Sequence, residues 1–98
     1  MTVYAIAQLD IHDRCRYERY QARFMEVFRR YQGCLLAADE HPGVIEGTWP
    51  YQKVVLMAFP DEPAFRQWAE SVEYQGIAQD RKAGATTTVL LVQGLADR

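Results

Sequence analysis

Residues 45–50 read IEGTWP, and a few positions later the run VVLMAF at 54–59 ends in Pro60. A second block, WAESVEYQ at 68–75, follows. The glycine of the first stretch predicts a turn, and the apolar run predicts a strand over 53–59 that is central and buried on both faces. The second block has apolar residues at helical spacing, and it contains a serine, a residue that often forms the N-cap of a helix. A turn, a central strand and a helix in this order indicate a mixed α and β fold and leave the chemistry open.

The segment before these stretches predicts a strand and then an amphipathic helix. Residues 3–11 alternate as in a strand, with both faces at least partly apolar. Asp13 offers an N-cap oxygen, and the apolar residues after it recur at steps of three and four, which predicts about four to five helical turns. Gly33 is expected to end this helix in the left-handed conformation. The repeating residues are Tyr17, Tyr20, Phe24, Val27, Phe28 and Tyr31.

A short strand and a loop are expected between this helix and the central strand. Residues 34–38 are apolar, and 39–43 contain the proline and glycine of a loop or a broken strand. Val44 and Ile45 are expected to resume strand pairing before Gly47 turns the chain.

The segment after the central strand predicts a helix, a further short helix and a last strand. Asp61 is the expected N-cap, with Pro63 in the first turn. Ser71 is expected to cap the short helix, which Gly76 interrupts or weakens. Residues 86–93, β-branched and then apolar, predict the strand. The apolar repeat of the first of these helices is Phe65, Trp68, Ala69 and Val72.

The predicted order is β-α-β-β-α-β, which is the α+β, ferredoxin-like plan: a four-stranded antiparallel sheet with both helices on one face. The other face is expected to be apolar as well, because Tyr4, Ile6 and both sets of alternate positions in 54–59 are apolar or aromatic. An exposed apolar sheet normally marks an interface. We therefore expect a homodimer whose sheets pack face to face; the alternative is a monomer in which that face is less polar than average.

Composition limits the class of protein. The chain has 98 residues, 49% of them hydrophobic and 24% charged, as in a single globular domain over 1–98. The net charge is −2 and the basic residues are scattered, so we expect no nucleic-acid partner. No apolar run approaches the length of about 20 residues that spans a bilayer, and the N-terminus does not resemble a signal peptide. These features predict a cytoplasmic protein.

Two cysteines, Cys15 and Cys34, are too few for a disulfide framework and lack the spacing of a metal site. We expect buried or half-buried free thiols and no metal. Phosphate-binding glycine loops, serine-hydrolase elbows and Cys-x-x-Cys pairs are absent from the sequence, so no cofactor is predicted.

Taken with their order, several of these motifs resemble one family, the bacterial domain of unknown function 1330, over nearly the whole chain. The resemblance implies a dimeric α/β barrel with a cleft in each subunit. The superfamily includes cofactor-free monooxygenases, isomerases, heme-dependent peroxidases and small-molecule sensors, so the fold does not select a function. The shared motifs are Tyr4-x-Ile6, Asp13, Gly33, Glu46-Gly47-x-Trp49-Pro50, Phe59-Pro60, Trp68, Ser71-x-Glu73-Tyr74-Gln75 and Arg81.

Three residues are candidate catalytic groups. His41 lies beside two acids in the loop and can act as a general base; the alternative is a solvated loop histidine. Glu46 precedes a glycine and a tryptophan, where desolvation can raise its pKa; otherwise it is a turn residue that accepts backbone N–H groups. Arg81 can clamp a carboxylate, or it can pair with Glu73 or Asp80.

Three aromatic residues are candidate ligand contacts. Trp49 can form a ligand-stacking wall or a dimer contact, and Tyr4 can present its hydroxyl to a cavity. Tyr74 is assigned to ligand binding, whereas Trp68 is assigned to the core.

Two hypotheses from different classes remain open. The first is a cofactor-independent isomerase or monooxygenase for an apolar or aromatic small molecule, with Glu46 or His41 as base and Arg81 stabilising an enolate. The second is a non-catalytic binding or sensing module. An acid, a base and a cation that converge in the cleft favour chemistry, whereas a purely apolar pocket favours binding. A heme site ranks last, because neither His12 nor His41 lies at a predicted axial position.

Overall fold

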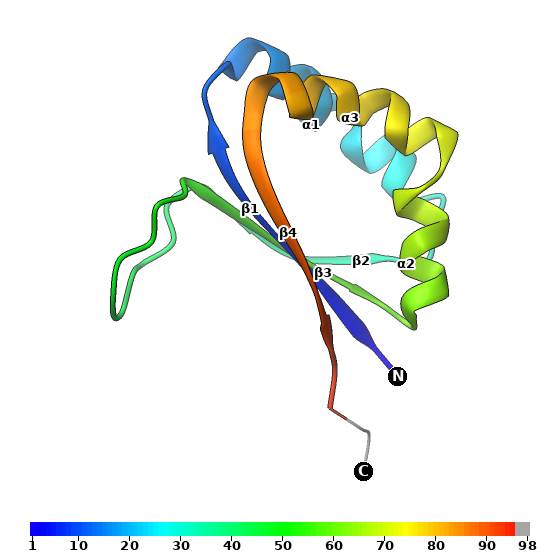
Figure 1. Ribbon diagram of the computed structural model, residues 1–98. Helices are drawn as coiled ribbons and strands as arrows, with labels where there is room; N and C mark the ends of the chain where they lie inside the picture. Colours follow the sequence, from blue (N-terminus) through cyan, green and yellow to red (C-terminus); the bar gives the residue numbers. More distant parts are fainter. Residues whose placement is uncertain (96–98) are drawn as a thin grey trace.

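Four antiparallel strands form a single sheet in the computed structural model, which describes residues 1–95. Their order across the sheet is β2-β3-β1-β4, so β1 and β3 are central (Figure 1). The strand that the apolar run at 54–59 predicted is therefore central, as expected. The strands are β1 (Val3–Ile11), β2 (Cys34–Asp39), β3 (Lys53–Phe59) and β4 (Ala85–Gln93).

Three helices cover one face of this sheet, namely α1 (Arg14–Phe28), α2 (Glu62–Ala69) and α3 (Val72–Gly84) (Figure 1). The predicted caps are present: the side chains of Asp13, Asp61 and Ser71 accept the backbone N–H three residues later at 3.2, 2.9 and 3.1 Å. Each bond satisfies an N–H group that has no partner inside its helix. The order is thus β-α-β-β-α-α-β, the predicted plan with its second helix divided in two. No helix in residues 1–95 is long and apolar enough to span a membrane.

The two faces of the sheet differ in burial. The odd-numbered residues of β1 from Val3 to Leu9 are buried beneath the helices, whereas Tyr4, Ile6 and Gln8 on the other face are half-buried. Ile6 lies opposite Leu56 of β3 and Leu90 of β4, so the outer face is apolar at its centre. This confirms the prediction of a second apolar face.

Aromatic rings fill the core between the sheet and the helices. The ring of Trp68 on α2 lies 5.3 Å from that of Phe28 on α1 and 5.6 Å from that of Phe59 on β3, between centroids. Edge-to-face and stacked contacts at such distances stabilise a core beyond the area that they bury. The assignment of Trp68 to the core is confirmed, because only 3% of this residue is exposed.

The predicted role of Gly33 is wrong. Among the glycines of the described chain only Gly47 has a positive φ, of 86°, and α1 ends at Phe28, before Tyr31. Gly33 is required for space instead: a Cβ there would lie 2.5 Å from Cζ of Phe28 and 2.6 Å from Cε2 of Phe59. The glycine therefore lets the chain pass close to two core rings as it enters β2.

The further helix predicted after Ser71 is present, but the predictions that it is short and that Gly76 interrupts or weakens it are wrong. α3 runs for 13 residues without interruption at Gly76, because no side chain or strained backbone opposes a helix there. Val72 belongs to the first turn of α3 and is 86% exposed, so it does not continue the buried stripe of α2.

Residues 40–52 form an arm that projects from the sheet, which corrects the expected pairing of Val44 and Ile45. β2 ends at Asp39, whose carboxylate accepts the backbone N–H of His41 at 2.8 Å and turns the chain. Pro42 then lacks the N–H that a strand ladder needs. Ile45, in the arm, is 96% exposed.

Both cysteines are exposed, contrary to the expectation of buried thiols. Cys15 lies two positions before the buried Tyr17 and so falls on the outward side of α1. Cys34 begins β2, which is an edge strand of the sheet.

Candidate functional site

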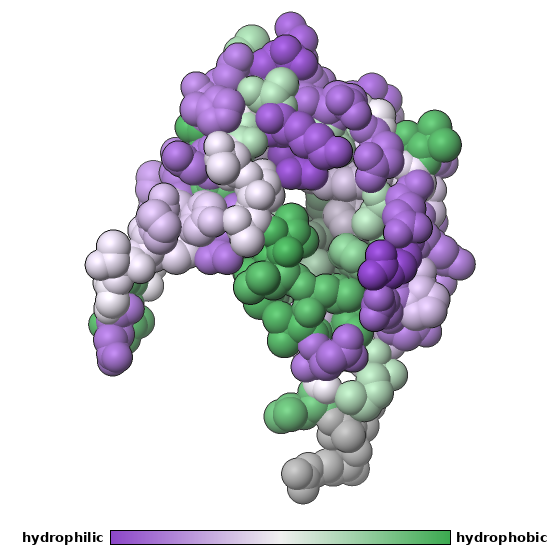
Figure 2. Space-filling model, viewed as in Figure 1, coloured by the Kyte–Doolittle hydropathy of each residue, from purple (hydrophilic) through white to green (hydrophobic). Residues whose placement is uncertain are grey.

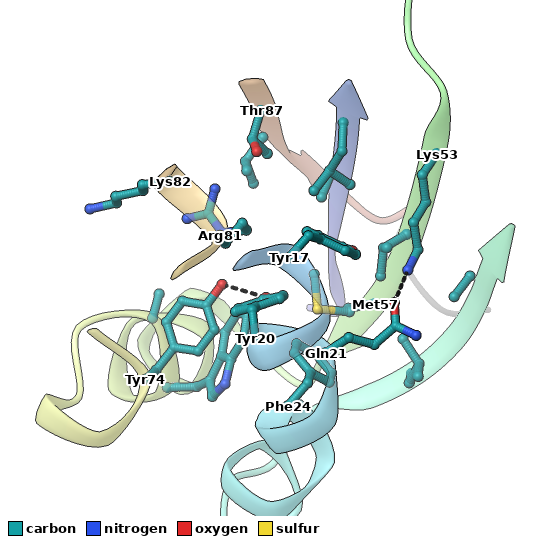
Figure 3. A pocket seen from close by; sticks show the side chains of 18 of the residues that line it. Tyr17, Tyr20, Gln21, Phe24, Lys53, Met57, Tyr74, Arg81, Lys82 and Thr87 are labelled. Carbon is teal, nitrogen blue, oxygen red and sulfur yellow. Dashed lines mark hydrogen bonds between the residues drawn. The ribbon is translucent and has the colours of Figure 1, made fainter. Parts of the chain in front are cut away.

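A cavity of about 550 Å³ lies between the inner face of the sheet and the three helices. Figure 2 shows apolar side chains gathered over the front strand β4, and the surface is hollowed between them and the polar helices. All four strands and all three helices contribute to the walls (Figure 3). The cavity thus lies where the helices leave part of the inner sheet face uncovered, near Val55 and Val89.

Aromatic side chains form much of the cavity wall. Tyr20 and Phe24 of α1 meet Tyr74 of α3 and Trp68 of α2, with ring centroids 4.2 to 6.1 Å apart. The predicted helical periodicity placed Tyr20, Phe24 and Trp68 on buried faces, whereas Tyr74 was predicted as a ligand contact; all four continue the aromatic core. A flat, apolar ligand would find ring faces and edges on this side of the cavity.

Tyr20 and Tyr74 form a buried hydroxyl pair, with 2.8 Å between their oxygens (Figure 3). One hydroxyl donates to the other, so the second keeps a hydrogen for another acceptor. Burial raises the pKa of Tyr20 well above its usual value, and the neighbouring Tyr74 raises it further. Tyr20 therefore stays protonated at neutral pH and keeps its hydroxyl hydrogen.

Lys53 places an amine in the opposite wall, at the start of β3. Only 6% of the residue is exposed; Nζ donates to Oε1 of Gln21 at 2.9 Å and lies 4.9 Å from the ring centroid of Tyr17 (Figure 3). Burial lowers the pKa of Lys53, although the charge of Glu40 opposes the change. A buried amine whose pKa is lowered is more readily deprotonated than a surface lysine.

Glu40 on the cavity rim is already paired. Its two carboxylate oxygens accept from Nη1 and Nη2 of Arg14, each at 3.0 Å, and this bond to Arg14 lowers the pKa of Glu40. A carboxylate held in this way is a weak base.

Arg81 and Thr87 bring polar atoms without partners into the cavity wall. Nε of Arg81 and Oγ1 of Thr87 are buried and have no hydrogen-bond partner among residues 1–95. The guanidinium carbon of Arg81 lies 5.9 Å from the ring centroid of Tyr20.

The two ion pairs predicted as alternatives for Arg81 do not form among the described residues. Asp80 accepts from Arg16 at 2.8 Å, and Glu73 accepts from the hydroxyl of Tyr31 at 3.3 Å. Buried donors without acceptors are uncommon in proteins, and each calls for an explanation such as a bound water or ion or a functional role.

The structure divides the predicted site residues into two groups. Arg81 and Tyr74 line the cavity. Tyr4 lies on the outer face of the sheet, and His41 and Glu46 are exposed on the arm, outside the cavity wall. The roles predicted for these three residues stay predictions.

Trp49 lies at the base of the arm, away from the cavity. Its Nε1 donates to Oε1 of Gln8 at 2.8 Å, and its ring centroid lies 5.9 Å from that of Tyr51. With Glu46 and Val54 it lines a second, shallow hollow on the arm side of the sheet.

Several cavity residues were not predicted from the sequence. Tyr17 and Tyr20 were assigned only to a buried helix face, and Lys53 only to the beginning of a strand. Thr87 was one of three threonines in a row. A lysine that opens an otherwise apolar central strand is the one signal that pointed to a special position, because lysine is rarely buried.

The described residues contain no group of three histidine, cysteine, aspartate or glutamate side chains that could hold a metal ion. What the cavity offers is an aromatic wall, three cationic side chains and several hydroxyl or N–H donors. It is therefore neither purely apolar nor a complete set of acid, base and cation.

Comparison with known proteins identifies both the fold class and the family of this chain. The topology is that of ferredoxin-like α+β proteins, and the solved structures that match include several with this description. Residues 2–95 match the family described as domain of unknown function (DUF1330), and the chain belongs to that family. Curated proteins give no significant match.

Three solved structures illustrate the likeness. A protein of unknown function from Rhodopseudomonas palustris is 14% identical, with a TM-score of 0.81, over 98% of this chain and 84% of that one. A dimeric ferredoxin-like protein of unknown function from a Jannaschia species is 15% identical, with a TM-score of 0.72, over 96% and 100%. SnoaB, a cofactor-independent oxygenase from Streptomyces nogalater, is 18% identical, with a TM-score of 0.70, over 98% and 95%. At these identities the likeness shows a common fold.

Proposed function

We propose that this protein binds an apolar or aromatic small molecule in the cavity between the sheet and the helices. The observation that carries the proposal is the cavity itself, whose volume of about 550 Å³ is in the usual range for small-molecule sites. Its wall combines six aromatic side chains with a few polar groups, which is the composition of sites that bury a flat ligand and fix its orientation.

A neutral aromatic probe tests this proposal. Isothermal titration calorimetry with 2-naphthamide should show binding to the wild type and loss of binding in Val89→Trp, which fills the cavity from β4. Thr86→Trp is the matched control, because Thr86 is exposed on the same strand and points to the other side of the sheet. Binding that survives Val89→Trp unchanged would place the ligand elsewhere and refute the proposal.

The same proposal includes a homodimer, formed by one domain over 1–98 with a cytoplasmic location. The outer sheet face supports it: Ile6, Leu56 and Leu90 lie side by side there, and Leu90 is 48% exposed. The relative from Jannaschia is itself described as dimeric. A second copy of the chain offers an equal apolar face that can cover this one.

Cofactor-independent proton transfer is the second candidate function, and Lys53 favours it. The amine forms no ion pair with any carboxylate of the described chain, and its pKa is lowered, so its neutral form can take a proton from an acidic C–H. Arg81 across the cavity can stabilise the resulting enolate. Return of the proton to another carbon gives an isomerase, and SnoaB, described as a cofactor-independent oxygenase, shares the fold.

For oxygenation the co-substrate is dioxygen, and the balance is CH₂ + O₂ → C=O + H₂O. Anthrone, an aromatic ketone with an acidic CH₂ group, is a suitable probe, since its conversion to anthraquinone is followed by absorbance. Wild-type protein should accelerate this conversion over buffer, and Lys53→Met should reduce the rate about 100-fold or more, as expected for loss of a general base. Equal rates for the wild type and buffer would leave non-catalytic binding as the function.

A further inference from the structure

Hydrogen-bond donors are in excess in the cavity wall. Nε of Arg81, Nε1 of Trp68 and Oγ1 of Thr87 are buried without partners in the described part of the chain. The Tyr20–Tyr74 pair adds one hydroxyl hydrogen that the pair itself does not use. Arginine and indole nitrogens cannot accept hydrogen bonds, so the groups that are missing from this wall are acceptors.

The charges in the wall have the same bias. Lys53, Arg81 and Lys82 are cationic, and Glu40 is the one acidic side chain that lines the cavity within residues 1–95. That carboxylate is held by Arg14 on the rim, so it does not neutralise Arg81. The chain as a whole carries a net charge of −2, and the cavity therefore concentrates positive charge in an acidic protein.

Arg81 and Thr87 belong to one end of the cavity. Arg81 lies in the last turn of α3, which ends at Gly84, and Thr87 is the third residue of β4, which begins at Ala85. Figure 3 shows both side chains at this end, with Tyr20 and Tyr74 below them. The tight α3–β4 junction depends on Gly84, where a Cβ would lie 2.8 Å from the backbone oxygen of Asp13. The two donors are thus presented by a junction that is fixed by packing.

We propose that the ligand is an aromatic or apolar acid whose anionic oxygen group, a carboxylate or an enolate or phenolate, binds at the α3–β4 end of the cavity to Arg81 and Thr87. The ring system of the ligand then lies among the aromatic side chains of α1, α2 and α3. This inference rests on the proposed small-molecule function and adds to it the chemical class of the ligand. An oxyanion satisfies the buried donors and supplies the countercharge that Arg81 lacks among residues 1–95.

A pair of isosteric probes tests the inference separately from the proposed function. 2-Naphthoate and 2-naphthamide have the same rings and differ in charge, and their affinities are measured by calorimetry at pH 7.5. The wild type should bind naphthoate about 10- to 100-fold more tightly than the amide, as expected for hydrogen bonds to a charged group. Arg81→Gln should remove this preference and leave the affinity for the amide within about two-fold.

Three further variants make the result specific. Arg19→Gln removes an arginine from an exposed position of α1 outside the cavity wall and should leave both affinities unchanged, which excludes a long-range charge effect. Thr87→Val keeps the shape of the side chain and should weaken naphthoate binding a few-fold without affecting the amide. Arg81→Lys, which retains the charge, should recover part of the preference even if Arg81→Gln folds poorly by circular dichroism.

Each outcome decides between the two proposals. Equal binding of both probes overturns the acidic ligand and leaves small-molecule binding intact. A naphthoate preference that survives in folded Arg81→Gln overturns the assignment of the anion to Arg81. Absence of binding for both probes overturns the acidic ligand together with the proposed function.

Discussion

At the scale of single residues, Tyr17 makes the protein sensitive to alkali. The side chain is 2% exposed, and burial raises its pKa to about 12. The pKa in the folded state is thus above the value of about 10 in an unfolded chain, so the stabilising contribution is complete below pH 10 and is lost as the pH rises towards 12. The two-unit difference corresponds to about 2.7 kcal/mol in the free energy of unfolding.

Tyr17→Phe should therefore reduce the loss of stability between about pH 9.5 and 11.5. Urea unfolding followed by circular dichroism at several pH values gives the free energy of unfolding for both proteins. Tyr31→Phe, at a half-buried tyrosine outside the cavity wall, is the control and should keep the wild-type slope. A variant at Tyr17 that loses stability as steeply as the wild type would show that this tyrosine ionises without cost in the folded protein.

Gly33 is the second residue with a strong local prediction. Because a Cβ there would meet the rings of Phe28 and Phe59 at 2.5 and 2.6 Å, Gly33→Ala should lower the free energy of unfolding by about 1–3 kcal/mol, as overpacking of a core usually does. Gly43→Ala, on the exposed arm with no atom within 4 Å of the new Cβ, should have little effect. Both values come from urea denaturation at pH 7. Equal stability of Gly33→Ala and the wild type would mean that the rings move aside freely.

At the scale of elements, Gly76 lowers the stability of α3 without an evident need for a glycine at this position. The position is exposed inside a helix of 13 residues, and a Cβ there would meet nothing within 4 Å. Gly76→Ala should raise the free energy of unfolding by about 0.5–1 kcal/mol, because alanine restricts the unfolded chain and favours helix. Thermal unfolding should show a higher midpoint for this variant. A lower midpoint would indicate that the glycine is needed for a contact, such as one in an assembly.

Features that depend on residues close together in the sequence were predicted correctly, whereas features that depend on distant residues were not. Asp13, Asp61 and Ser71 were correctly assigned as caps, because a cap is formed by residues three positions apart in the sequence. Gly33 was misinterpreted, since its real constraint is the space between the ring of Phe28 and that of Phe59, which is 26 residues away. Local patterns predict helix starts and strand faces, whereas close approaches between distant segments have no local signature.

The candidate site shows the same limit. Arg81 and Tyr74 were singled out from the sequence and do line the cavity, but Lys53 was not, and Glu46 and His41 lie on the arm instead. Whether a side chain enters a cavity depends on which strands are neighbours and on the parity of the residue along its strand. Lys53 reaches the cavity because it has the same parity in β3 as the buried Met57 and Phe59.

At the scale of the whole molecule, the two faces of the sheet differ in what covers them. The inner face is only partly covered by helices, and the uncovered part becomes the cavity. The outer face has no helix over it in the described chain, and its centre is apolar. A sheet of this kind gains little by facing water, so association of two copies would complete the burial that one small domain begins.

Leu90→Asp should therefore convert the protein to a monomer. The residue lies on the outer face of the edge strand β4, opposite Ile6 of the central strand β1, and a buried carboxylate without a partner disfavours a packed sheet interface strongly. Val72→Asp is the matched control, because Val72 is also apolar and even more exposed but lies at the start of α3 on the helix side. Size-exclusion chromatography with light scattering should give the mass of two chains for the wild type and Val72→Asp, and of one chain for Leu90→Asp. A wild-type mass of one chain would show that the outer face remains uncovered, and a dimeric Leu90→Asp would place the interface on another surface, such as the arm.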